Sequence, residues 1–506
     1  MDGCHAMQSH MIQLPRRIPK VLPGTHNRRF FRNFAAELVR KNKNMSSGES
    51  KKRQVDMLHG PLSGKILTFS IPLIASGILQ QSFNAVDVAM IGRYSTTQAI
   101  AAVGSNGPII SILVNLFLGI AIGANAVIAT YLGQKNHDAV RRSVSTVVII
   151  SLLSGFILMF LGTTLARPIL DAMSAPPDVI DLAEEYLSIF FCGMPFMMTY
   201  NFGSAIMRSV GDTSLPFYAL LVGTVCNLAL DWLFAGVFGW GVSGVAWATV
   251  ISTGVNAAII VYFLTREPQP VTLSLKPRSW RLSRPDLNKM LRIGIPAGLQ
   301  GMVFSISNIF IQSAINSFGS DAIAGSAAAL TYEVYCYYIV SAFCAATIAF
   351  AGQNYGAGEF GRCKSVLRIC MLYSVVLCGA SNLLVAWQGH ACISLFSSSP
   401  EVMHYALVRF NTVLVFQCLA SSYEISGSYM RALGYSLTPM LLTVFGTCVL
   451  RLGWVTVFRS IDDSFHGLLI IYPITWIITG TAVFAAALLV QHRVFGRKST
   501  CRPEPT

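Results

Sequence analysis

The sequence predicts an all-α polytopic membrane protein with twelve transmembrane helices arranged as two six-helix repeats. Hydrophobic residues make up 53% of the 506 residues and charged residues only 12%, whereas a soluble domain carries roughly 25% charge. Apolar stretches of about 20 residues, long enough to cross the hydrocarbon core of a bilayer, recur along the chain. Motifs in the first half also return in the second half at a near-constant spacing.

Six apolar stretches fall in each half of the chain and define two lobes. The N-lobe covers 60–264 and the C-lobe 289–490, with a linker at 265–288 between them. The expected spans are approximately 64–91, 107–132, 143–165, 183–207, 213–236, 240–264, 289–316, 324–350, 366–389, 403–430, 437–458 and 465–490.

The two lobes are copies of one unit. The Met-Arg-x-x-Gly motif that begins at Met207 returns at Met430, 223 residues later, and Pro72 returns as Pro296, 224 residues later. An even number of spans leaves both copies in the same orientation, so we expect an axis along the membrane normal to relate them. A substrate pocket is then expected between the lobes.

Basic residues predict the orientation in the membrane. Most of the 37 Lys and Arg residues lie in the first 60 residues, the linker, the C-terminal tail at 491–506 and alternate short loops. By the positive-inside rule, these segments and both termini are cytoplasmic. The net charge of +14 therefore indicates topology and affinity for anionic lipid, and is weak evidence for nucleic acid because the charges are scattered.

The basic segment 1–59 is expected to be a cytoplasmic tail. It lacks the apolar core of a signal peptide. Met45 is a candidate for the true start of the chain, and the alternative is a disordered tail that begins at Met1.

Motifs for enzymes and molecular motors are absent from the sequence. It contains no Walker, Gly-x-Gly-x-x-Gly or His-Glu-x-x-His pattern and no Cys-x-x-Cys, and its nine histidines are scattered. We therefore expect a protein that is not an enzyme and that needs no organic cofactor or resident metal.

A few ionisable and polar residues at membrane depth are candidates for function. In the N-lobe these are Asp87 in the first span, Asn201 in the fourth, Asn227 and Asp231 in the fifth, and Thr249 in the sixth. Asn227 and Asp231 share a helix face through their i, i+4 spacing. Intramembrane carboxylates are functional candidates because burying them is unfavourable, and an oxygen-rich cluster suits a proton relay or a sodium site. The alternative for Asn201 and Thr249 is a role in helix packing.

The C-lobe contains a different set of buried charges, Glu333, Glu424 and Arg451. A buried arginine requires a carboxylate partner, and the two glutamates are the candidates. The set is interpreted as a structural ion pair, as a charged wall of the substrate pocket or as a second coupling site. Pro72 lies in the first span, where it removes a backbone hydrogen bond and permits a kink.

Several short motifs appear in a fixed order along both copies. They are Gly60-Pro61-Leu62-Ser63-Gly64-Lys65, Asn84-Ala85-Val86-Asp87, Tyr131-Leu132-Gly133-Gln134, Met207-Arg208-Ser209-Val210-Gly211-Asp212, Asn227-Leu228-Ala229-Leu230-Asp231-Trp232, Gly241-Val242-Ser243-Gly244 and Gly352-Gln353-Asn354-Tyr355-Gly356. In these motifs, from about Met57 to Val490, the chain resembles the multidrug and toxic compound extrusion (MATE) transporters. The resemblance is nearest to their bacterial, DinF-like branch.

The resemblance implies a V-shaped bundle of two six-helix lobes around a central cavity, in the plasma membrane of a bacterium. It implies a monomeric antiporter that exports small amphipathic, often cationic, drugs or metabolites in exchange for H⁺ or Na⁺. The family's ion-coupling site matches Asp87, Asn201, Asn227, Asp231 and Thr249, with Na⁺ expected at Asp87, Asn227 and Asp231. The family's kinking proline matches Pro72.

One departure from the family concerns the ion site. Some members hold sodium in the C-lobe through an acidic residue in the seventh span, and residues 294–317 contain none, which favours coupling in the N-lobe. The alternatives are a flippase for lipid-linked precursors and a narrow-substrate exporter of related fold. A flippase is expected to have a more basic cavity, and only Arg451 is expected to lie deep here.

Overall fold

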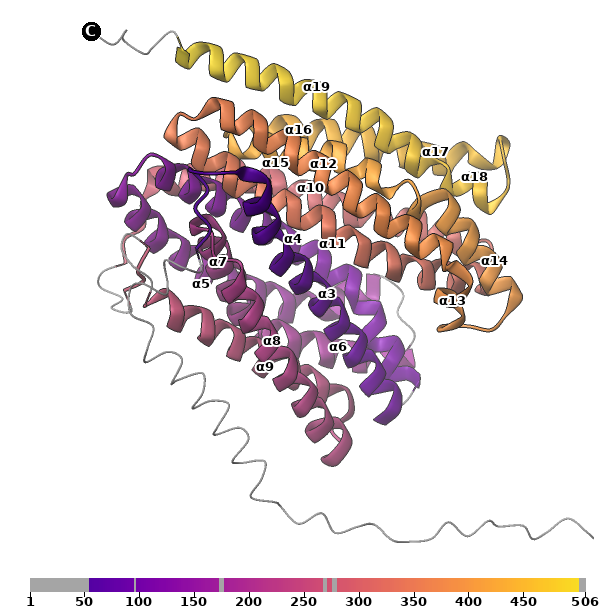
Figure 1. The fold of residues 1–506 in the computed structure, drawn as a ribbon. Coiled ribbons are helices and arrows are strands. Elements are labelled where there is room, and N and C mark those ends of the chain that lie inside the picture. Colours follow the sequence, from indigo (N-terminus) through magenta and orange to yellow (C-terminus); the bar gives the residue numbers. More distant parts are fainter. Residues whose placement is uncertain (1–53, 95–96, 173–176, 267–270, 275–279, 500–506) are drawn as a thin grey trace, which may run out of the picture. The chain divides into compact units, whose positions relative to one another are not determined.

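The computed structural model describes residues 54–94, 97–172, 177–266, 271–274 and 280–499, which form helices and no strand (Figure 1). Eleven helical stretches in this part of the chain are long and apolar enough to cross a membrane. The fourth expected span, 183–207, is not among them because it consists of two helices. These are α6, with 16 residues, and α7, with 17 residues, which are separated at Gly193.

The two repeats follow one another along the chain (Figure 1). The first repeat contains α3 (Leu62–Tyr94), α4 (Thr97–Gly133), α5 (His137–Ala172), α6 (Pro177–Cys192), α7 (Met194–Val210), α8 (Ser214–Asp231) and α9 (Gly241–Leu264). The second contains α10 (Arg284–Asn316), α11 (Ser320–Ala357), α12 (Phe360–Trp387), α13 (Gly389–Ser394), α14 (Pro400–Arg409), α15 (Ser421–Ala432), α16 (Leu437–Thr443), α17 (Leu450–Val457), α18 (Phe465–Leu469) and α19 (Ile471–Ser499).

The repeats also share their helical irregularities. The fourth span of the first repeat breaks at Gly193, and its counterpart breaks between Arg409 and Ser421. The fifth spans both contain a π-helical segment, Trp232–Val237 in the first repeat and Val444–Val449 in the second. Such segments occur often at functional sites, so each fifth span is a place to look for one.

The segment before α3 is packed, which corrects the expected tail of 1–59. Met57 is 1% exposed, and the Asn354 side chain donates to the Met57 carbonyl at 3.0 Å. Arg362 donates to the Gly60 carbonyl at 3.0 Å. Residues of the expected tail are therefore part of the packed structure, because an apolar side chain and backbone carbonyls in this segment find partners in the C-lobe. The candidate start Met45 lies outside the described residues.

Two other boundaries differ from the expected ones. Helix α10 begins at Arg284, inside the expected linker of 265–288, and α19 continues to Ser499, beyond the expected end at 490. Phe495 in this extension stacks on Phe360 with ring centroids 4.6 Å apart. Hydropathy detects only the part of a helix within the hydrocarbon, so polar helix ends escape it.

The lobes meet where α4 packs against α10. Gly119 faces Gly298, and a Cβ atom at Gly119 would lie 2.2 Å from the Gly298 backbone nitrogen. A Cβ at Gly294 would lie 2.5 Å from the Ile120 Cα, so two backbones are in direct contact. Glycines at these positions allow the two helices to approach without side chains between them.

Replacing Gly119 with alanine is expected to destabilise the protein by about 1–3 kcal/mol, because the new methyl group meets backbone that cannot move aside. Gly107 on the same helix is the matched control, since a Cβ there would have nothing within 4 Å. Gly107→Ala should be neutral or slightly stabilising through helix propensity. The measurement is the thermal unfolding midpoint of each variant in detergent. Equal midpoints for both variants would contradict the close crossing.

Candidate functional site

Four polar side chains from three helices meet inside the N-lobe. Asp87 lies on α3, Asn227 and Asp231 on α8, and Thr249 on α9. All four are buried, from 0% exposure at Asp231 to 7% at Thr249. The helical period brings Asn227 and Asp231 to one face of α8, and packing of α3 and α9 against α8 adds the other two.

The amide of Asn227 connects the two carboxylates. With its nitrogen toward them, it donates to Asp87 Oδ1 at 3.1 Å and to Asp231 Oδ2 at 3.0 Å. The Thr249 hydroxyl donates to Asp87 Oδ2 at 3.2 Å. The partners are therefore neutral donors that leave the negative charge uncompensated.

The two carboxylates form a site for a small cation. Within the described residues, neither Asp87 nor Asp231 has a Lys, Arg or His nitrogen within 4 Å. Asp231 Oδ1 has no hydrogen-bond partner there either. Two buried like charges without a basic partner repel one another, so a proton or a metal cation stabilises the pair. Carboxylate, amide and hydroxyl oxygens are ligands that hard cations prefer.

Asn201 does not join this cluster. Its amide nitrogen donates to the Met197 carbonyl of its own helix α7 at 2.8 Å, and no hydrogen bond in the described part of the chain links it to either carboxylate. Sequence reasoning missed Tyr186 on α6, a buried residue whose hydroxyl lies within electrostatic range of both Asp87 and Asp231. A tyrosine within an apolar stretch is typical of a helix core, so its sequence position held no signal.

Pro72 lies on the same helix as Asp87. Helix α3 runs from Leu62 to Tyr94 without interruption, and the Ser76 hydroxyl donates to the Pro72 carbonyl at 2.8 Å. The two residues are about 22 Å apart along the axis at 1.5 Å per residue. The structure therefore places a weakened turn and an ionisable group at opposite ends of one span.

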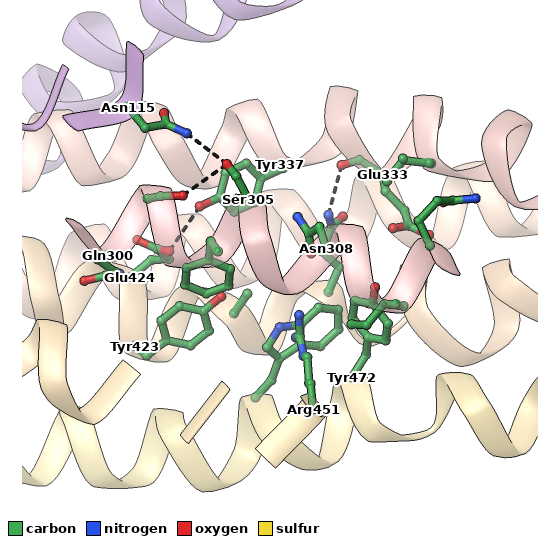
Figure 2. A pocket seen from close by; sticks show the side chains of 18 of the residues that line it. Asn115, Gln300, Ser305, Asn308, Glu333, Tyr337, Tyr423, Glu424, Arg451 and Tyr472 are labelled. Carbon is green, nitrogen blue, oxygen red and sulfur yellow. Dashed lines mark hydrogen bonds between the residues drawn. The ribbon is translucent and has the colours of Figure 1, made fainter. Parts of the chain in front are cut away.

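The C-lobe contains a second polar site, a cavity of about 470 Å³ (Figure 2). Residues of α10, α11, α14, α15, α17 and α19 and of the 3₁₀ turn Gln417–Ala420 line it, together with Asn115 and Ile122 of α4 from the other lobe. Its ionisable lining residues are Glu333, Arg409, Glu424, Arg431 and Arg451. Three arginines face two glutamates, which leaves one positive charge in excess.

The expected pairing of Arg451 with a glutamate is wrong. Glu333 pairs instead with Arg409 in a two-bond geometry, with Nε to Oε1 at 2.6 Å and Nη2 to Oε2 at 2.9 Å. Arg409 also donates to Ser326 at 2.6 Å. The expectation that only Arg451 lies deep is also wrong, since Arg409 is 3% exposed. Arg409 lies on α14, which packs against α11, the helix of Glu333, and sequence spacing alone does not indicate this contact.

Glu424 takes partners other than Arg451. The Tyr337 hydroxyl donates to Glu424 Oε1 at 3.1 Å, as Figure 2 shows. Arg431 donates to Gln300 Oε1 at 2.7 Å. Within the described residues, the hydrogen-bond partner of the Glu424 carboxylate is thus a phenol and not an arginine.

Arg451 is held by neutral groups only. Its Nε donates to the Thr475 hydroxyl at 3.2 Å, and its guanidinium carbon lies 4.1 Å from the centre of the Tyr472 ring and 5.8 Å from that of Trp476. Figure 2 shows Arg451 and Tyr472 extending from the C-terminal helices toward the cavity. A guanidinium stacked on an aromatic ring retains its positive charge and its outer N–H groups.

Comparison with known protein sequences gives matches across both repeats. The family model MatE matches residues 72–233 and 296–455. The chain is 31% identical over 382 residues to the probable multidrug resistance protein YoeA of Bacillus subtilis, covering 74% of this chain and 82% of that protein. It is 25% identical over 449 residues to a protein of Shewanella oneidensis named FAD transporter, covering 85% and 95% of the two chains.

Comparison with solved structures identifies the same fold. A crystal structure of MATE in the bent conformation matches with a TM-score of 0.81 at 22% identity, over 88% of this chain and 99% of that one. A MOP superfamily transporter from Pyrococcus furiosus matches with a TM-score of 0.82 at 22% identity, over 87% of this chain and 98% of that one. The twelve-helix, two-repeat arrangement indicated by the sequence is confirmed at this level.

Proposed function

Because the chain belongs to the MATE family of multi-pass membrane transporters, we propose that it is a secondary active antiporter that exports amphipathic compounds, including cationic ones, in exchange for H⁺ or Na⁺. The observation that supports this proposal is the buried pair Asp87 and Asp231, joined by Asn227 and without a basic partner among the described residues. An antiporter needs one group that alternates between a charged and a neutralised state within the membrane. This pair supplies it.

The coupling step is a change in charge at Asp87 and Asp231. Entry of a cation neutralises the site, which removes the repulsion between the carboxylates and changes how α3 packs against α8 and α9. Helix α3 then bends near Pro72, where one backbone hydrogen bond is missing. Bending moves a helix that packs against α11 of the other lobe, so the cavity between the lobes changes shape and releases the cargo outward.

Both coupling ions suit the donors present. For a proton, the Asn227 nitrogen donates to both carboxylates and the added hydrogen removes their repulsion. For Na⁺, half a turn of the Asn227 amide presents its oxygen instead, beside the free Asp231 Oδ1 and the Asp87 carboxylate. Thr249 contributes a hydroxyl in either case.

The setting that we propose is the bacterial plasma membrane, with a monomeric protein and both termini cytoplasmic. The relatives with the names given above are bacterial. The distribution of Lys and Arg among the loops supports this orientation.

The test is efflux of ethidium from cells that express the protein, driven by an imposed pH gradient or an imposed sodium gradient. Efflux with one gradient and not with the other is expected, and the effective gradient identifies the coupling ion. Cells that express an unrelated multi-pass protein at the same level are the control. Efflux with neither gradient, at verified expression, would contradict the proposal and favour the flippase or a narrow-substrate exporter.

A further inference from the structure

We propose that the C-lobe cavity contains an anion site, in which Arg451 binds the phosphate or carboxylate group of an amphipathic compound with a planar ring. The inference rests on the proposed function in one respect, since it treats this cavity as a place where cargo binds. It goes beyond that function because it assigns the charge of the cargo group and the residue that recognises it.

Arg451 has no acidic partner in the described part of the chain. It is 2% exposed, yet within the described residues no carboxylate lies within 4 Å of it, and its Nη2 has no hydrogen-bond partner. A buried charge without a counterion is strongly unfavourable in a folded protein. An anionic ligand in the cavity that Arg451 lines supplies the missing counter-charge.

The other charges that line the cavity do not neutralise Arg451. Glu333 accepts from Nε and Nη2 of Arg409, and Glu424 accepts from the Tyr337 hydroxyl. The lining has three arginines and two glutamates, and within the described residues Arg431 and Arg451 are the two of these arginines with no carboxylate within 4 Å.

The side chain of Arg451 is held in place without a ligand. The bond from its Nε to Thr475 and the contact with the Tyr472 ring hold the guanidinium at the cavity wall (Figure 2). A guanidinium held in one orientation binds phosphate or carboxylate through a pair of N–H groups and loses little side-chain entropy in doing so.

Aromatic side chains in the same cavity suit the rest of the ligand. Phe304, Tyr423 and Trp476 line the same cavity, and rings of this kind pack against planar apolar groups. A volume of about 470 Å³ is within the range of small-molecule sites. Arg451 and these aromatic rings together suit one class of compound, in which an acidic group is attached to a flat ring system.

The fifth spans of the two lobes carry different buried charges. Asp231 lies in the fifth span of the N-lobe, directly before the π-helical segment Trp232–Val237. Arg451 lies in the fifth span of the C-lobe, and the 223-residue offset aligns it with the apolar Leu228 and not with Asp231. The positive charge at this position therefore has no counterpart in the N-lobe copy.

The experiment is equilibrium binding to the full-length protein in nanodiscs, without any ion gradient. The probes are riboflavin 5′-phosphate and riboflavin, which share one fluorescent ring system and differ in the phosphate. We expect the phosphate form to bind about 10- to 100-fold more tightly, the factor that a charge-assisted hydrogen bond provides. Arg451→Met should remove most of that difference, and Arg451→Lys should restore part of it.

Separate readouts distinguish this inference from the proposed function. Binding is measured without an ion gradient, so a failure of ion-driven efflux leaves the binding result intact. The control variant Arg459→Met, which changes an exposed arginine, should leave the preference unchanged. Equal affinity of the wild type for the two probes would overturn the inference, as would equal weakening of both probes by Arg451→Met.

The lipid composition of the nanodiscs distinguishes two sources of the anionic group. Competition with the phosphate probe when phosphatidylglycerol replaces phosphatidylcholine would identify a lipid headgroup as an occupant of the anion site. Affinity independent of the lipid would identify free small anions as the ligands. Either result, combined with the effect of Arg451→Met, supports an anion site at Arg451.

Discussion

Replacing Asp231 with asparagine is expected to abolish ion-driven efflux while the protein still folds. The substitution preserves the shape of the side chain and removes the negative charge that the coupling cation neutralises. Asp231 is fully buried and is joined to Asp87 by the Asn227 amide. Without its negative charge, Asp87 is the only carboxylate left in this cluster of four side chains. Changing even the outer partners of an ion site lowers affinity or activity by roughly 10- to 100-fold, and loss of a direct ligand should exceed that. The measurement is the initial rate of ethidium efflux under the gradient that drives the wild type.

The matched control is the same chemical change at Asp181, an exposed residue whose carboxylate pairs with Arg167 at 2.6 Å. Asp181→Asn should retain efflux close to that of the wild type, because surface ion pairs contribute little. The melting temperatures of both variants report on folding. Wild-type efflux by a folded Asp231→Asn variant would show that coupling does not depend on the N-lobe pair.

Much of the helical arrangement follows from the sequence because it depends on local properties. Apolar length predicts the spans, and the 223-residue repeat predicts that both lobes have the same order of elements. The break at Gly193 in the fourth span is harder to predict, because hydropathy is continuous across it. The C-terminal part of α19, which includes Phe495, is not predicted because it lies in polar sequence. Its stacking partner, Phe360, is far away along the chain.

The carboxylates of the N-lobe site were predictable from the sequence because burying a charge in an apolar span is unfavourable and therefore rare. Asp87 and Asp231 stand out in apolar spans, and the structure brings them together with Asn227 and Thr249. Their role in coupling stays a prediction. Tyr186 was not predictable, since its proximity to both carboxylates depends on how α6 packs against α9.

The C-lobe shows where sequence reasoning is insufficient. The sequence indicates that Glu333, Glu424 and Arg451 are buried, but which charges meet depends on the direction of each side chain. Arg409 reaches Glu333 because α14 packs against α11. Spacing within one span contains no information about a contact between two spans.

The ion pair between Arg409 and Glu333 is expected to be the strongest single electrostatic determinant of C-lobe stability. Both side chains are nearly inaccessible to solvent, at 3% and 6% exposure, and share two hydrogen bonds. Removing one partner leaves the other charge buried and unpaired, so Glu333→Gln and Arg409→Met should each destabilise the protein by about 3–5 kcal/mol. The double variant should lose less than the sum of the two, with a coupling energy of about 2–3 kcal/mol. The measurement is unfolding of the four proteins by sodium dodecyl sulfate in mixed micelles.

An exposed pair in the same lobe, Arg459 and Asp463, is the control for this cycle. Their atoms are 3.6 Å apart and both side chains are more than half exposed. Solvent screening limits such a pair to about 0–1 kcal/mol, so the cycle of Arg459→Met and Asp463→Asn should give a coupling energy near zero. A coupling energy near zero for Arg409 and Glu333 as well would mean that water reaches both groups. The cavity wall at Glu333 would then be part of an open, solvated binding surface. Strong coupling would instead assign the pair to the framework of the C-lobe. Arg431 and Arg451 would then be the cavity arginines that have no carboxylate within 4 Å in the described residues.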